Sequence, residues 1–371
     1  MTVTVTDLSR GGPGVARDDQ GRVIFLPLTA PGDRVVARIV AQEKRYAEGE
    51  VVEWLEKSAL RVEPACEAFG RCGGCQWQHL PYDYQWKTKV AGVRHALERS
   101  SVAVPAAFEE LPAEQVLGYR NRIQLRSEGQ TLGFFARRSH ETIDLKGCPV
   151  ARAELNAVWE ETRAMAVEKN GTSRDGRTKV ELEVLPEGSI RRIFNAPHAA
   201  GGFRQVHDAQ NEKLKAWVAS AVPNGAWLFD LYGGSGNLSL GLASRQAGVD
   251  CVDVGGPIPD APGNFRFHRK PVRAWLQSER KRLKGAAPSQ ARESCMVLDP
   301  PREGLERDFV GIVEAAEAWR VGTVVLVGCD VDSWVRDLAR LGRHGWKVSR
   351  VGVLDLFPQT AHVESLAVLK R

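Results

Sequence analysis

Four cysteines constrain the fold of this chain more than any other feature. Cys66, Cys72 and Cys75 stand close together, and Cys148 follows much later in the segment Lys-Gly-Cys-Pro. Thiolates are soft ligands that select zinc, copper(I) or iron–sulfur clusters. Two glycines separate the second cysteine from the third, so the backbone can wrap tightly around one centre. The pattern predicts a metal site that joins a local cysteine loop to a distant part of the chain.

The spacing alone leaves the identity of the metal open. Structural zinc sites usually use two paired thiol motifs, whereas a local run followed by a distant cysteine is closer to the arrangement of iron–sulfur sites. We expect an iron–sulfur cluster held by Cys66, Cys72, Cys75 and Cys148. Zinc and unliganded thiols are the alternatives.

The sequence also indicates the compartment in which the protein works. The amino-terminal segment has neither the basic nor the apolar region of a signal sequence. No apolar run approaches the roughly 20 residues of a membrane-spanning helix. We therefore expect a protein of the reducing cytoplasm with no membrane partner, and we do not expect a disulfide framework.

The charge of the chain is mildly basic and unevenly distributed. A net charge of +5 over 371 residues does not by itself indicate a nucleic-acid partner. Residues 266–292, however, contain nine basic residues and one acidic residue. A second cluster places five arginines around two phenylalanines: Arg120, Arg122, Arg126, Arg137 and Arg138. Either run alone is ordinary for a solvated surface, but together they favour a polyanion such as RNA.

The length and the pattern of short apolar segments predict a multi-domain protein. Residues 2–56 contain four or five short strand-like segments separated by glycine and proline turns, which suggests a small OB-like β-barrel. We divide the chain into three domains. The barrel spans 1–58, a central α/β domain that contains the cysteine loop (66–75) spans 59–200, and a Rossmann-like α/β domain spans 201–371.

The last domain contains a glycine-rich turn between a predicted strand and a predicted helix. The strand includes Asp230, and the turn is Gly-Gly-Ser-Gly-Asn at 233–237. Later apolar strands end in Asp253 and in Asp299, and the latter is followed by Pro-Pro-Arg. Because parallel strands end at the same edge of a sheet, these residues predict a small-molecule site, with Asp253 placed for a ribose hydroxyl.

Cys329 follows another apolar strand at the same predicted edge. A free cysteine considered alone is most often a buried core residue. Beside a cofactor turn and a carboxylate from a neighbouring strand, it can instead act as a nucleophile that shares one substrate with a base.

In combination these motifs resemble the RNA uracil-5 methyltransferase family, in the branch that has an amino-terminal TRAM domain and a four-iron four-sulfur cluster. The matching segments are Met1–Ser58, Cys66–Leu80, Tyr119–Arg122, Phe203–Gln205, Asp230–Asn237, Asp299–Gly304, Cys329 and Phe357–Ser365. The resemblance implies S-adenosylmethionine-dependent methylation of uridine C5 in structured RNA. It points to 23S ribosomal RNA rather than tRNA, because the bacterial tRNA branch generally lacks the barrel and the cluster.

The resemblance also implies roles for single residues. Cys329 would add to uracil C6, Glu364 would remove the C5 proton, and the uridine would flip out of its stack. The implied cofactor pocket contains residues of the glycine-rich turn and residues from other segments: Gln205, Asp230, Tyr232, Gly234, Gly236, Asn237, Asp253 and Asp299. The implied ligands of the [4Fe-4S] cluster are Cys66, Cys72, Cys75 and Cys148. We expect a monomer.

The chain departs from the family in two places. After Asp253, where the family has a helix, Pro257, Pro259 and Pro262 prevent one, so we expect an altered pocket for the adenosine. The proline that the family places soon after the nucleophile is replaced by Val331. Because Cys329 and Glu364 are both present, we expect an active enzyme.

Other functions remain open. One is an RNA-binding protein of the same fold with weak or lost methyltransferase activity. Another is a tRNA uridine-5 methyltransferase. A cluster-bearing redox protein ranks last, because it leaves the large methyltransferase-like domain without a purpose.

Overall fold

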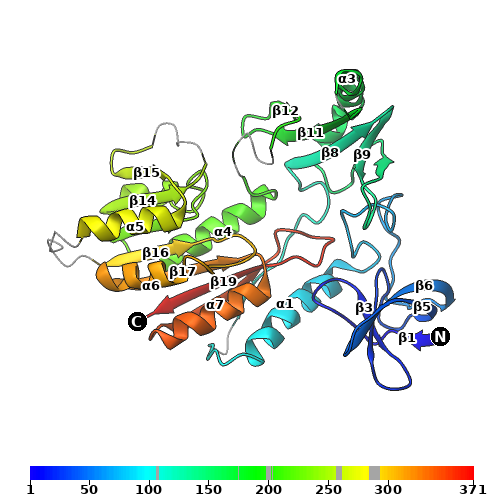
Figure 1. Ribbon diagram of the computed structural model, residues 1–371, viewed down its shortest axis with the longest axis horizontal. Helices are drawn as coiled ribbons and strands as arrows, with labels where there is room; N and C mark the ends of the chain where they lie inside the picture. Colours follow the sequence, from blue (N-terminus) through cyan, green and yellow to red (C-terminus); the bar gives the residue numbers. More distant parts are fainter. Residues whose placement is uncertain (106–107, 174, 198–201, 203, 256–260, 284–292) are drawn as a thin grey trace.

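The structure, a computed structural model, describes residues 1–371 apart from 106–107, 174, 198–201, 203, 256–260 and 284–292, and apart from the side chains of 280–283. Within the described residues the strands form three sheets. Figure 1 shows the amino-terminal and central sheets on one side of the molecule and the large carboxy-terminal sheet, with its helices, on the other. Among the described residues, no helix is long and apolar enough to cross a membrane.

The amino-terminal sheet closes on itself. Its strands are β1 (Thr2–Thr4), β2 (Asp7–Leu8), β3 (Gly14–Arg17), β4 (Val23–Leu26), β5 (Arg34–Gln42) and β6 (Tyr46–Glu56), in the order β1-β5-β6-β4-β3-β2. The two end strands, β1 and β2, are separated in the chain only by Val5 and Thr6. The backbone N–H of Thr6 donates to the carbonyl of Val15 at 2.8 Å. This connection joins the two ends of the sheet around an interior of apolar side chains. The predicted small barrel is confirmed.

The central sheet is antiparallel, in the order β10-β9-β8-β11-β12. Its elements are β8 (Arg122–Glu128), β9 (Thr131–Phe135), β10 (Thr142–Asp144), α2 (Ala153–Ala157), α3 (Trp159–Thr172), β11 (Arg177–Val184) and β12 (Ile190–Phe194). Leu125 packs with Leu155 and Trp159 in a core between sheet and helices. The cysteine loop borders this sheet, because Cys72 bridges to Ala136 just after β9.

The large sheet is mostly parallel, in the order β15-β14-β13-β16-β17-β19-β18-β7, with β19 antiparallel to both of its neighbours. Its elements are β7 (Phe108–Leu111), α4 (Asp208–Ala221), β13 (Trp227–Leu231), the 3₁₀ helix η1 (Leu240–Arg245), β14 (Gly248–Asp253), β15 (Phe265–Arg269), α5 (Val272–Leu283), β16 (Ser294–Leu298), α6 (Phe309–Ala318), β17 (Val321–Gly328), α7 (Val331–Arg343), β18 (Lys347–Leu354) and β19 (Glu364–Lys370). The predicted Rossmann-like domain is confirmed. The helix expected directly after the glycine turn is only the 3₁₀ helix η1, since β14 begins three residues after it.

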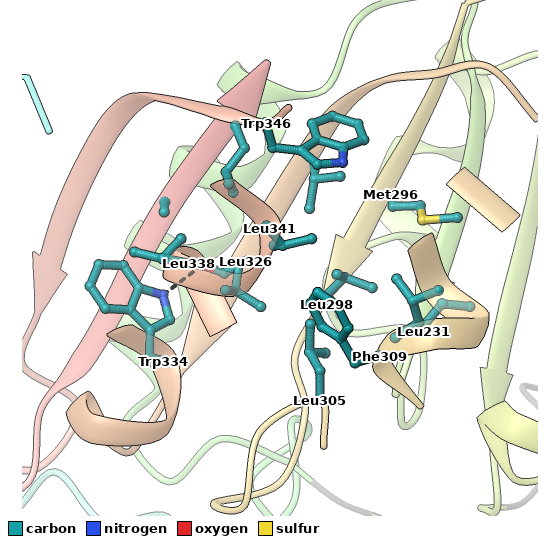
Figure 2. Close-up of a cluster of buried hydrophobic side chains, with 14 of the residues drawn as sticks. Leu231, Met296, Leu298, Leu305, Phe309, Leu326, Trp334, Leu338, Leu341 and Trp346 are labelled. Atoms are coloured by element: carbon teal, nitrogen blue, oxygen red, sulfur yellow. Dashed lines mark hydrogen bonds between the residues drawn. The ribbon is translucent and has the colours of Figure 1, made fainter. Parts of the chain in front are cut away.

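One face of the large sheet carries the main core of the protein. Figure 2 shows Leu326 of β17 beside Leu338 and Trp334 of α7, and Leu298 of β16 beside Phe309 of α6. The indole N–H of Trp334 donates to the carbonyl of Leu326 at 3.2 Å, which fixes α7 to β17.

Helix α1 (Tyr82–Glu98) and strand β7 belong to this large sheet rather than to the central domain. The apolar stripe of α1, which contains Trp86, Val90, Val93 and Leu97, packs into the core shared with α7. Strand β7 pairs parallel to β18. The division predicted for 59–200 therefore differs from the structure. The physical reason is that the periodicity of an amphipathic helix predicts which of its faces is apolar. It does not predict against which part of the protein that face packs.

Truncating Trp86 to alanine should lower the free energy of unfolding by about 3–5 kcal/mol, the usual cost of removing a buried tryptophan. Lys87→Ala, on the exposed side of the same helix, should change it by less than about 0.5 kcal/mol. Urea unfolding measures the loss, and hydrogen exchange of the β7 and β18 amides should locate it in the large sheet. Exchange that increases only in the central sheet would contradict this placement of α1.

Candidate active site

Cys329 stands at the junction of β17 and α7, at the predicted edge of the sheet. Its side chain is half-buried, whereas Cys251 and Cys295 are fully buried within strands. Next to it, the Asp330 carboxylate accepts a hydrogen bond from the Ser333 N–H at 2.9 Å and so caps α7. The thiol is therefore held by a strand end and a capped helix start.

The sheet order brings two carboxyl groups to this thiol. Asp299 follows β16 and Glu364 begins β19, and these two strands flank β17. β16 runs parallel to β17, while β19 runs antiparallel and pairs Ser365 with Gly328. The end of β16, the end of β17 and the start of β19 therefore lie at one edge. The thiol and the two carboxyls of the predicted site come from three adjacent strands.

Burial dominates the acid–base chemistry of these groups. It raises the pKa of Asp299 to about 7, with a further contribution from the nearby Asp230. It also raises the pKa of Glu364 well above its ordinary value, and Asp299 adds to this effect. The pKa of the Cys329 thiol rises to about 12, first through burial and then through Glu364 and Asp299, while Arg302 opposes the shift. Burial therefore disfavours the ionised form of all three groups, and Arg302 partly offsets this for Cys329 and Glu364.

The glycine turn lies at the end of β13, as predicted. A side chain at Gly233 would collide with Cys251 and Asp230, at 2.5 and 2.6 Å from its Cβ. Gly234 and Gly236 have φ angles of 55° and 72°. The Asp253 carboxylate accepts hydrogen bonds from the N–H groups of Gly234 at 3.1 Å and Gly255 at 2.7 Å. Asp253 thus contacts the turn directly, and three of the five residues of the turn are glycines without a side chain.

Asp230 supports the turn from behind. Its side chain is fully buried and accepts a hydrogen bond from the Ser239 hydroxyl at 2.5 Å. Burial raises its pKa to about 6, and hydrogen bonds from Ser239 and Cys251 oppose the rise. Among the predicted pocket residues, Asp230 therefore holds the loop and does not present its carboxylate to solvent.

The other predicted pocket residues have different surroundings. The Tyr232 hydroxyl donates to the Asp308 carboxylate at 2.7 Å. Asn237 forms a reciprocal amide pair with Asn211 of α4, at 2.8 and 2.9 Å. Gln205 is buried, and its backbone carbonyl accepts a hydrogen bond from the Asn121 amide at 2.9 Å. Sequence reasoning missed Asn211 and Asp308, because each is recognisable only through its partner across the fold.

The four predicted metal ligands line one cavity of about 310 Å³. Arg120, Ile123, Phe134 and Leu145 also line it. Burial raises the pKa of Cys75 to about 12 and also raises those of Cys72 and Cys148, while Arg120 opposes all three shifts. Over the described ranges, no three thiol, imidazole or carboxyl groups meet the geometry of a single-ion site.

The arginine cluster differs from a free phosphate-binding surface. Arg122 is buried and bonds to Glu183 at 2.8 Å, and Arg138 pairs with Glu48 of the barrel at 2.9 Å. In the second basic run, Arg266 holds Asp250 at 2.7 and 2.8 Å. The side chains of 280–292 in that run lie outside the described residues, as do 256–260 of the proline-rich segment.

Comparison with known proteins agrees with this geometry. A TRAM domain model matches residues 1–52, and a model described as tRNA (uracil-5-)-methyltransferase matches residues 273–371. An uncharacterised RNA methyltransferase of Bdellovibrio bacteriovorus is 31% identical over 100% of this chain and 95% of its own length. The 23S rRNA (uracil(1939)-C(5))-methyltransferase RlmD of Chromohalobacter salexigens is 30% identical over 100% of this chain and 89% of its own. The chain belongs to the RNA uracil-5 methyltransferase family.

A solved structure shares the whole fold. The Pyrococcus abyssi tRNA (uracil-54, C5)-methyltransferase, solved in complex with S-adenosyl-L-homocysteine, is 22% identical. The two structures superpose over 100% of this chain and 99% of the Pyrococcus abyssi chain, with a TM-score of 0.74. The arrangement of barrel, central sheet and large sheet is therefore a fold already seen in a methyltransferase.

Replacing Asp299 with asparagine should make the Cys329 thiol more reactive. The substitution removes a negative charge that raises the thiol pKa, although burial, the larger cause, remains. Alkylation by iodoacetamide at pH 8 should therefore become faster, as measured by mass spectrometry of the peptide that contains Cys329. Asp332→Asn, an exposed carboxylate on α7, should leave the rate unchanged. Equal rates for wild type and Asp299→Asn would contradict the coupling between carboxyl and thiol.

Proposed function

We propose that this protein transfers a methyl group from S-adenosylmethionine to C5 of a specific uridine in 23S ribosomal RNA. The observation that carries the proposal is the meeting of Cys329, Asp299 and Glu364 at the ends of three adjacent strands. The relative named as a 23S rRNA methyltransferase aligns with the whole chain and supports this substrate. A tRNA substrate is the second candidate, because the matching family model is described by that activity. We further propose a cytoplasmic monomer.

The chemistry requires a nucleophile and a base on one uracil. The Cys329 thiolate would bond to C6, which makes C5 nucleophilic. S-adenosylmethionine, held at the glycine turn, would supply the methyl group to C5. Glu364 would then accept the C5 proton, the C5–C6 double bond would form again, and the sulfur would leave C6. The uridine must leave the base stack to reach the thiol.

The residues of the turn fit such a cofactor. The glycines of the turn let a ligand approach the backbone, and Asp253 stands beside them for a ribose hydroxyl. Asp299 and Glu364 become easier to ionise when a cation such as a sulfonium lies beside them. Since a protonated Glu364 cannot accept a proton, we propose that cofactor binding prepares the base.

We also propose that the four cysteines hold a [4Fe-4S] cluster. On a tetrahedral zinc ion, with bonds of about 2.3 Å, the sulfurs would lie about 3.8 Å apart. In a cluster the four thiolates surround a much larger group. A cavity of about 310 Å³ lined by Cys66, Cys72, Cys75 and Cys148 fits the larger group.

The nucleophile and base can be tested with unmodified 23S rRNA and tRNA transcripts. Cys329→Ala should form no covalent adduct and transfer no methyl group. Glu364→Gln should still add and methylate but not eliminate, so a methylated protein–RNA adduct should accumulate on denaturing gels. The adduct should form with 23S rRNA, whereas an adduct with tRNA alone would favour the second candidate. Full turnover by Glu364→Gln would require a different base.

The metal can be tested on protein purified without oxygen. Iron and acid-labile sulfide should be present in equal amounts, about four of each per chain, as a [4Fe-4S] centre requires. Cys148→Ser should lose most of both and become less stable, because the remote ligand joins two parts of the chain. Cys295→Ala, a buried thiol in β16, should keep the full iron content. Stoichiometric zinc without iron would overturn the proposal.

A further inference from the structure

Helix α1 has a buried polar face as well as its apolar stripe. Tyr82, Gln85 and Lys89 follow one another at spacings of three and four residues, so they share one side of the helix. All three bond to the catalytic loop, which we define as residues 355–363, between β18 and Glu364. The Tyr82 hydroxyl donates to Asp355 at 3.1 Å, and the Lys89 ammonium donates to Asp355 at 2.8 Å and to the Phe357 carbonyl at 3.0 Å.

Gln85 connects the catalytic loop to the chain that follows the cysteines. Its amide N–H groups donate to the carbonyls of Trp77 at 3.0 Å and Leu80 at 2.9 Å, and to the side-chain oxygen of Gln359 at 3.0 Å. Its own side-chain oxygen accepts from the Gln359 backbone N–H at 3.0 Å. The whole Gln85 side chain is buried. One amide therefore bonds to both segments.

Gln359 is also held directly by the residues beside Cys75. Its backbone carbonyl accepts hydrogen bonds from the N–H groups of Gln76 and Trp77, both at 3.1 Å. Its φ angle of 68° is unfavourable for a residue other than glycine, and such conformations persist where the surroundings hold them. The catalytic loop thus keeps a strained shape through contacts with α1 and the cysteine loop.

We propose that Gln85 is a positioning residue for the proton-abstraction step. It fixes the loop that leads into Glu364, and a base works only within hydrogen-bond reach of the proton it removes. Cys329 depends on different supports, namely β17 and the cap of α7. Loosening the catalytic loop should therefore slow elimination while addition and methyl transfer continue. The inference rests on the proposed roles of Cys329 and Glu364.

The test compares two 23S rRNA transcripts, one with uridine and one with 5-fluorouridine. Fluorine at C5 cannot leave as a proton, so every competent enzyme stops at the adduct. Gln85→Ala should form this fluorinated adduct at the wild-type rate. On the uridine transcript its turnover should fall about 10- to 100-fold, in line with a small misplacement of a catalytic group. A methylated adduct should accumulate there, with iron content unchanged.

Two controls separate positioning from general damage. Asn170→Ala removes another buried amide, which donates to the oxygens of Ser127 and Gly129, and should not accumulate adduct. Gln359→Gly keeps the positive φ and the backbone bonds but removes one acceptor, so it should show the same signature more weakly even if Gln85→Ala folds poorly.

The outcomes are distinguishable from failure of the proposed function. Equal slowing of Gln85→Ala on both transcripts, or normal elimination, would overturn the positioning role. If Glu364→Gln forms no adduct on the uridine transcript, the proposed base fails, and the inference fails with it.

Discussion

The buried ion pair between Lys89 and Asp355 is the contact that fixes helix α1 to the catalytic loop. Both side chains are fully buried, and two unpaired charges there would be very costly to desolvate. Burial lowers the pKa of Lys89, and Asp355 opposes that shift. The Asp355 carboxylate also accepts hydrogen bonds from the Tyr82 hydroxyl at 3.1 Å and from the Phe357 N–H at 3.0 Å. Losing one partner of such a pair typically costs about 3–5 kcal/mol, so α1 and the catalytic loop stay joined.

The barrel meets the same junction from the other side. The Trp77 indole N–H donates to the carbonyl of Gly12, in the barrel turn, at 2.8 Å. A side chain at Gly12 would lie 3.4 Å from Gln76 and 3.5 Å from Ala361, so the turn approaches both the cysteine loop and the catalytic loop. The barrel is therefore connected to the loop before Glu364 through packed contacts.

The sequence predicted the edge of the large sheet well, because strand topology determines where strand ends lie. Asp299 and Cys329 were placed together by this rule alone. The role of Asp230 was harder to predict, since a carboxylate at a strand end can face either a ligand or the back of a turn. The packing around the carboxylate determines which of the two it faces. The same limit applies to Arg122, whose partner Glu183 becomes visible only when β8 and β11 pair. Gln85 gave no signal, because a polar residue in an amphipathic helix normally faces water.

The cysteine cavity contains one more contact with the catalytic loop. Arg120 lines the cavity, and its pKa is raised although burial opposes the shift, first by Tyr119 and then by the thiols of Cys75 and Cys148. Its neighbour Tyr119 is buried and donates its hydroxyl to the Pro358 carbonyl at 3.0 Å. A guanidinium beside thiols is stabilised when those thiols are ionised, as thiols are when they bind a metal centre. If the four cysteines hold the proposed cluster, its loss would remove that stabilisation one residue away from a bond to the catalytic loop. The cavity and the loop before Glu364, the proposed base, are thus linked through Tyr119 as well as through Gln359.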